Sequence, residues 1–170
     1  MLAKKQIVDT LTLLDQRYND ALLASSQQDS IFYSKLAILE YCGWIEDIFD
    51  KIVRRSVKGK LRTQDYQKIL EKSVVGRNYG FQYEEHFRQM LIKAIGLKQT
   101  ENIEIHLKRN GYLPILISEL AAVKQDRDSA AHTWVKNTTR TYPAPSVTKS
   151  RVNKVYPIAK EIYSLVVSLR

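Results

Sequence analysis

The chain has very little cysteine and histidine: one cysteine, Cys42, and three histidines among 170 residues. A single cysteine cannot form a disulfide within the chain, and its rarity suits a reducing compartment. Because the cysteine and the histidines also lack the close spacing of zinc ligands, we expect neither a metal site nor another cofactor. On an apolar helix face, Cys42 is expected to be a packed small side chain rather than a nucleophile.

Long apolar runs are missing as well. No segment approaches the ~18 apolar residues that span a bilayer. The N-terminal segment is amphipathic and carries Asp9, Asp15 and Asp20, which a signal peptide would not. The sequence also has no glycine-rich phosphate loop, no GxSxG elbow and no paired-carboxylate motif. We therefore expect a cytoplasmic protein that contacts no membrane.

Acidic residues are in the minority. The chain has 27 Lys and Arg against 18 Asp and Glu, which gives a formal net charge of +9. This balance favours polyanionic partners, chiefly nucleic acid. On charge alone, a basic surface that serves only solubility is an equally good interpretation.

Apolar residues repeat at helical spacing almost throughout, and no stretch sustains a period of two residues. This pattern predicts an all-α protein, and the length fits one domain over residues 1–170. Within it, residues 63–111 are expected to form a helical insertion. Pro157 should bend the last helix near Asn153. The predicted helices cover approximately residues 7–25, 30–55, 64–75, 83–95, 101–108, 113–135 and 152–169.

The most informative feature is the string Arg127-Asp128-Ser129-Ala130-Ala131-His132. An arginine can bind two phosphate oxygens at once, and a histidine can move protons near neutral pH, so the pair suits RNA cleavage. Arg127 interrupts an apolar stripe, and its guanidinium must therefore find a carboxylate or a phosphate. His132 lies roughly 140° further round an α-helix. The two side chains can meet at one site only if the helix kinks or if a second subunit supplies the other half.

Glu46 is the acidic residue most expected to be partly buried, because it falls between two apolar sets on the predicted helix 30–55. It is the natural partner for Arg127 if the two helices pack antiparallel. Such a pair can simply tie two helices together, or it can hold Arg127 in place for a phosphate. The sequence leaves both interpretations open.

The string RDSAAHT, which follows a helix ending in AAVKQD, and the segment LEYCGWIEDIF resemble the HEPN superfamily, in particular its RiboL-PSP-HEPN branch. The signature of that superfamily is an arginine, a polar residue, three to five further residues and a histidine. Arg127, Asp128 and His132 fill these positions. The resemblance covers residues 5–56 and 113–168. It implies a helical bundle that dimerises so that two copies of the motif face one cleft.

Many members of this superfamily are metal-independent endoribonucleases of toxin–antitoxin, phage-defence and RNA-processing systems. The resemblance therefore implies RNA as the substrate, with Arg127, Asp128 and His132 as the catalytic residues. It also implies a homodimer, and an antitoxin or a nucleotidyltransferase as a further partner. The alternative is a non-catalytic HEPN module that binds nucleic acid or a partner protein.

The loop NTTRTYPAPSV follows the predicted motif helix. In it, Arg140 and Tyr142 offer a cation and an aromatic ring that could grip and stack single-stranded RNA. A prolyl loop in which Tyr142 packs on its neighbours is an equally good interpretation.

Overall fold

The computed structural model describes residues 2–132 and 141–169, and within them it is all-α, as the apolar periodicity predicts. No strand occurs among these residues. Two elements, η1 and η2, are π-helical, with backbone hydrogen bonds that span five residues instead of four. The elements are α1 (Lys5–Leu23), α2 (Gln27–Val57), α3 (Gln64–Ile69), η1 (Leu70–Val75), η2 (Tyr83–Phe87), α4 (Arg88–Ile95), α5 (Leu97–Arg109), α6 (Tyr112–His132) and α7 (Pro145–Ser168).

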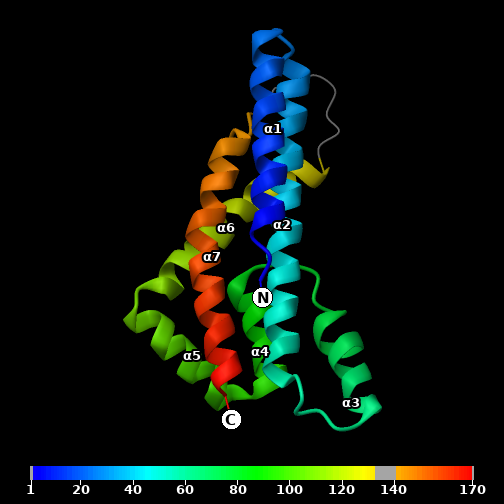
Figure 1. The fold of residues 1–170 in the computed structure, drawn as a ribbon, viewed down its shortest axis with the longest axis vertical. Coiled ribbons are helices and arrows are strands. Elements are labelled where there is room, and N and C mark those ends of the chain that lie inside the picture. The colour runs from blue at the N-terminus through cyan, green and yellow to red at the C-terminus, as the bar shows by residue number, and fades with distance from the viewer. Residues whose placement is uncertain (1, 133–140, 170) are drawn as a thin grey trace.

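A long antiparallel hairpin of α1 and α2 forms the axis of the molecule, and α7 lies alongside it (Figure 1). The hairpin turns where Ser25 takes a left-handed conformation with a φ of 57°. There the N–H of Ser26 donates to the carbonyl of Ala21 at 2.8 Å, which satisfies an acceptor that the helix end leaves unpaired. In the same view, α6 lies behind the hairpin, α4 and α5 lie towards its lower end, and α3 stands outside it.

α2 is the central helix because its buried side chains face α1, α4, α6 and α7. Phe49 of α2 stacks on Phe87 of η2, with ring centroids 4.0 Å apart and planes inclined by 10°. The buried residues of the 63–111 segment belong to the same hydrophobic cluster as those of α1, α2, α6 and α7. The segment that we expected to be an insertion is therefore packed on the common core.

The two predicted helices 64–75 and 83–95 each combine an α-helical and a π-helical part. In η2, the N–H of Phe87 donates to the carbonyl of Gln82 at 3.1 Å, the five-residue spacing of a π-helix. The wider turn buries Tyr83 and Phe87 together, and their rings meet edge to face. The π-helical turn η2 therefore contributes two aromatic rings to the core from five residues.

The last helix begins at Pro145, earlier than the predicted start near residue 152. A proline suits the first turn of a helix because its missing N–H would have no helical partner there. The next N–H, that of Ser146, donates to Asp15 Oδ1 of α1 at 2.9 Å. Pro157 lies inside α7, which continues past it, although Pro157 offers no N–H to the carbonyl of Asn153.

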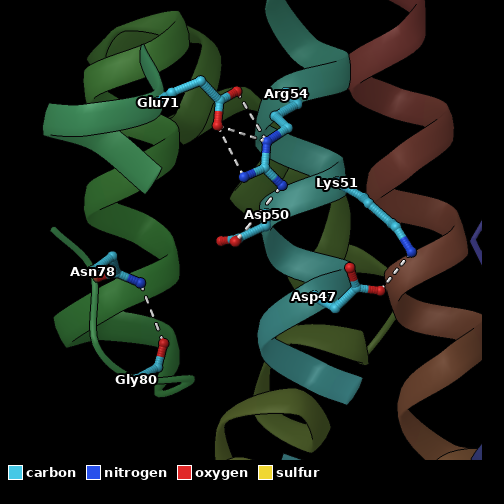
Figure 2. Close-up of polar contacts among 7 residues, drawn as sticks. All are labelled: Asp47, Asp50, Lys51, Arg54, Glu71, Asn78 and Gly80. Carbon is cyan, nitrogen blue, oxygen red and sulfur yellow. Dashed lines mark hydrogen bonds and ion pairs between the residues drawn. The ribbon is translucent and has the colours of Figure 1, made fainter. Parts of the chain in front are cut away.

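One group of charges ties η1 to α2 (Figure 2). Arg54 of α2 forks onto Glu71 of η1, with Nε–Oε1 and Nη2–Oε2 distances of 3.0 Å each. Asp50, one turn earlier on α2, lies 3.7 Å from the same guanidinium. Burial nevertheless raises the pKa of Asp50 from 3.8 to about 6, because desolvation of the carboxylate outweighs the attraction of Arg54. Ionised Asp50 therefore costs the folded state free energy at neutral pH.

Asp50→Asn is accordingly expected to stabilise the protein at neutral pH. Since the folded-state pKa lies above the ordinary value, the proton on Asp50 contributes stability that is full below pH 3.8 and is lost as the pH rises through about 6. Asparagine removes the cost of ionisation, worth about 1–2 kcal/mol at neutral pH for a partly exposed side chain. Urea unfolding at about pH 7 and about pH 4 measures the difference, and the gain should vanish at the lower pH.

Asp47→Asn is the matched control, since Asp47 lies on the same helix at the exposed surface and pairs with Lys51. It should give no gain at either pH. An equal gain for Asp50→Asn at both pH values would contradict the burial effect.

Candidate functional site

The motif occupies the C-terminal end of α6, which is helical without interruption from Tyr112 to His132. The apolar stripe predicted for this helix is confirmed at Leu116, Leu120 and Val123, which are all buried in the core, whereas Ala131, which was predicted to belong to it, is exposed. Arg127 lies on the same face of α6, between Val123 and buried Ala130, and its side chain is 37% exposed. The guanidinium thus reaches the surface while its stem packs against the bundle.

Arg127 does not pair with Glu46, contrary to our expectation. Its Nη1 atom instead lies 3.2 Å from Oδ1 of the adjacent Asp128, and Glu46 takes part in no ion pair among the described residues. The physical reason is exposure, because the Arg127 side chain is 37% exposed and its guanidinium can keep contact with solvent without a carboxylate from α2. Asp128, the polar residue of the motif, is therefore the carboxylate that pairs with Arg127.

Glu46 nevertheless lies close to the motif, as the surroundings of Cys42 show. Burial raises the pKa of the Cys42 thiol to about 12, while the charge of Arg127 lowers it and the charge of Glu46 raises it. Both side chains therefore act on one buried atom between α2 and α6. The thiol stays protonated at neutral pH, and Cys42 is a packed, buried side chain as expected.

The structure places the remaining predicted residues unequally. His132 is the last residue of α6, but its side chain lies outside what the structure describes. Helical geometry puts the backbone of His132 roughly 140° round the helix from that of Arg127 and about 7.5 Å further along the axis. Arg140 also lies outside the described residues. For Tyr142, the packed alternative describes the structure, because the half-buried ring lies on the core and its hydroxyl is 3.2 Å from Oγ of buried Ser129.

A second charged contact fixes the motif helix against α7. Arg151 Nη2 lies 3.6 Å from Asp126 Oδ2, and the two side chains are only 15% and 25% exposed. Asp126 immediately precedes Arg127 in the sequence, so this pair holds the turn from which Arg127 projects. Two turns earlier on α6 and about one turn later on α7, Lys154 Nζ lies 2.6 Å from Glu119 Oε1. Two ion pairs therefore join the motif helix to α7, in addition to its buried apolar face.

Arg127 and Asp128 line a pocket of about 260 Å³ between α6 and the segment that leads into η2. Sequence reasoning missed the other side chains of this pocket, chiefly Lys124 and His86. Lys124 could have been found, because residues three apart on a helix share a face with one another. His86 could not, because no motif links it to α6. The complete lining is Tyr79, Gly80, Phe81, Gln82, Glu85, His86, Lys124, Arg127 and Asp128.

A larger hollow of about 590 Å³ lies elsewhere, at the C-terminal end of α2. Arg54, Arg55 and Lys58 line it together with apolar side chains. Arg54 already forms an ion pair with Glu71. Twelve residues along α2 separate Arg54 from Cys42, or about 18 Å at the rise of an α-helix. The motif therefore belongs to the smaller pocket. Among the described residues, no three His, Cys, Asp or Glu side chains are grouped so that they could hold a metal ion.

Comparisons of the chain with known protein families, with curated proteins and with solved structures found no match. The resemblance of the RDSAAHT string to the HEPN superfamily therefore stays a prediction. Within the part of the chain that the structure describes, every helix is too short or too polar to pass through a bilayer.

Proposed function

We propose that the protein is an endoribonuclease that cleaves RNA without a metal ion and uses Arg127, Asp128 and His132. One observation carries the proposal: Arg127 and Lys124 bring two cations to a pocket on α6, on the same helix that ends at His132. A recess with fixed cations suits a phosphate of a polyanion, and the net charge of +9 favours the same class of ligand. The resemblance of the motif to a ribonuclease superfamily supports this choice.

The residues suit attack by the ribose 2′-OH on the adjacent phosphorus. In that reaction a base takes the 2′-OH proton as the new O–P bond forms, and an acid gives a proton to O5′ as the P–O5′ bond breaks. His132 can serve as either group near neutral pH. Arg127 stays charged and can stabilise the extra negative charge of the phosphorane, with Asp128 holding the guanidinium.

The proposal includes a homodimer. Because α6 is uninterrupted, Arg127 and His132 of one chain occupy helix positions roughly 140° apart, and a second chain would bring two copies of the motif to one cleft. Light scattering over a concentration series should then give about twice the chain mass of 19.7 kDa. A strict monomer at tens of micromolar would count against a shared cleft.

The proposed reaction is tested by the chemistry of its products. Cleavage of RNA should persist in EDTA and should leave 2′,3′-cyclic phosphates and 5′-hydroxyls, because the nucleophile is the ribose 2′-OH. DNA, and RNA with 2′-deoxy substitution at the cut site, should resist because they lack that nucleophile. Mass spectrometry of the fragments identifies the ends. Products with 5′-phosphates, or binding of RNA with no cleavage, would refute the reaction, and the second result would favour a non-catalytic RNA-binding module.

A further inference from the structure

The pocket beside the motif is built from two separate parts of the chain. One wall is the last part of α6, with Lys124, Arg127 and Asp128, and the other runs from Tyr79 to His86 at the start of η2. π-helical turns such as η2 occur frequently at functional sites. The pocket volume of about 260 Å³ is below the roughly 300–1,000 Å³ of sites that enclose a drug-sized ligand. The space therefore fits a small group such as a phosphate with part of its sugar.

The α6 wall supplies cations with unused hydrogen-bonding capacity. Lys124 is half-buried, and no hydrogen bond or ion pair joins it to any other described residue. Arg127 donates from Nη1 to Asp128 at 3.2 Å, and a guanidinium has five N–H donors in all. The acidic groups of the pocket are Asp128, which is already paired with Arg127, and Glu85, which is exposed. Lys124 is thus a cation at the pocket wall that forms no ion pair with any described residue.

The opposite wall holds an imidazole in a fixed position. His86 Nδ1 is shielded from solvent and has no hydrogen-bond partner among the described residues. The other edge of the ring lies against Gly80, where an added Cβ would come within 2.5 Å of His86 Nε2. Asn78 Nδ2 donates to the carbonyl of Gly80 at 3.2 Å and so orders this turn (Figure 2). The His86 ring therefore lines the pocket with one nitrogen, Nδ1, that has no hydrogen-bond partner among the described residues.

We propose that this pocket is a phosphate-binding subsite for RNA, in which Lys124 and Arg127 supply the charge and His86 supplies an imidazole N–H. Residues far apart in the sequence would then recognise the substrate together, and the 63–111 segment would contribute to the site through His86. That the phosphate belongs to RNA rests on the proposed function, whereas phosphate binding itself does not.

The test uses the full chain labelled with ¹³C at histidine, because its three histidines give three distinguishable signals. The probes are inorganic phosphate and a fully 2′-O-methylated RNA oligonucleotide, which cannot be cleaved through the 2′-OH. Both should shift the His86 signal in a saturable way and leave that of His106 unchanged. His106 is the internal control, because it lies on α5 and pairs with Glu161 at 2.8 Å.

Variants make the assignment specific. Lys124→Gln and His86→Gln should each weaken oligonucleotide binding by about tenfold or more, since a hydrogen bond to a charged group has about that value. Lys108→Gln, an exposed position on α5 with the same change of charge, should bind as wild type. Because no hydrogen bond or ion pair joins Lys124 to another described residue and glutamine keeps most of its stem, Lys124→Gln keeps the proposal testable even if His86→Gln fails to fold.

The outcomes separate this subsite from the ribonuclease reaction. A His86 signal unmoved by either probe, or wild-type affinity in Lys124→Gln, would overturn the subsite. A response to inorganic phosphate but not to the oligonucleotide would overturn RNA as its ligand. If both probes shift His86 but natural RNA is bound without being cut, the subsite holds and the proposed reaction fails.

Discussion

His132→Ala should lower the rate of RNA cleavage by roughly 10²–10⁴-fold, the usual contribution of a general acid or base. The fold should survive, because His132 is the last residue of α6 and alanine is the most favourable helix former. Cleavage of a fluorescent RNA oligonucleotide measures the rate, and circular dichroism establishes that the two proteins are equally helical. We therefore expect His132→Ala to lower the cleavage rate without changing the fold.

His106→Ala is the matched control for this prediction. His106 is also a histidine on a helix, but it contacts Glu161 of α7 at the surface, where an ion pair contributes little to stability. It should keep the wild-type rate. A folded His132→Ala protein with undiminished cleavage would exclude His132 from the reaction, and an equal loss in His106→Ala would show that the loss is not specific.

Phe87→Ala should reduce the free energy of unfolding by about 3–5 kcal/mol, the range found for large aromatic side chains removed from cores. Phe87 is completely buried, stacks on Phe49 of α2 and meets Tyr83 edge to face. Its loss would leave a cavity between η2 and the central helix. Denaturant unfolding measures the change, and phosphate binding should weaken as well, because His86 is the preceding residue.

Phe32→Ala is the control for the core prediction, since the Phe32 side chain is 59% exposed on α2. Its removal should change the unfolding free energy by less than about 0.5 kcal/mol, as for most surface substitutions. If Phe87→Ala lost no more than Phe32→Ala, the aromatic contact between η2 and α2 would not be a principal support of the fold.

The helices were largely predictable because their apolar faces repeat with the helical period over many residues. On α6 the stripe through Leu116, Leu120 and Val123 is buried as expected, and Arg127 falls on the same face with a partly exposed side chain. The partner of Arg127 was not predictable from α6 alone. Whether Arg127 pairs with Glu46 or with Asp128 depends on the rotation of α6 about its own axis relative to α2. The spacing of apolar residues along α6 does not determine that rotation.

The second wall of the pocket could not be predicted for a different reason. The position of His86 depends on the π-helical turn, on the buried rings of Tyr83 and Phe87, and on close contact with Gly80. Each of these is a tertiary effect on a segment of five residues, too short for a periodic pattern to be distinctive. The ion pair between Arg151 and Asp126 could not be predicted from the sequence either, because the partial burial of Arg151 follows only from the packing of α7 on α6.

The position of α3 outside the bundle makes stability uneven along the chain. None of its residues is buried, and η1, which continues it, buries only Val74 and Val75. The fork between Arg54 and Glu71 is itself at the surface, where ion pairs are worth about 1 kcal/mol or less. This arm can therefore open at a small fraction of the free energy needed to unfold the bundle. Its amides should exchange with solvent first, and a protease should cut it while the motif helix stays folded.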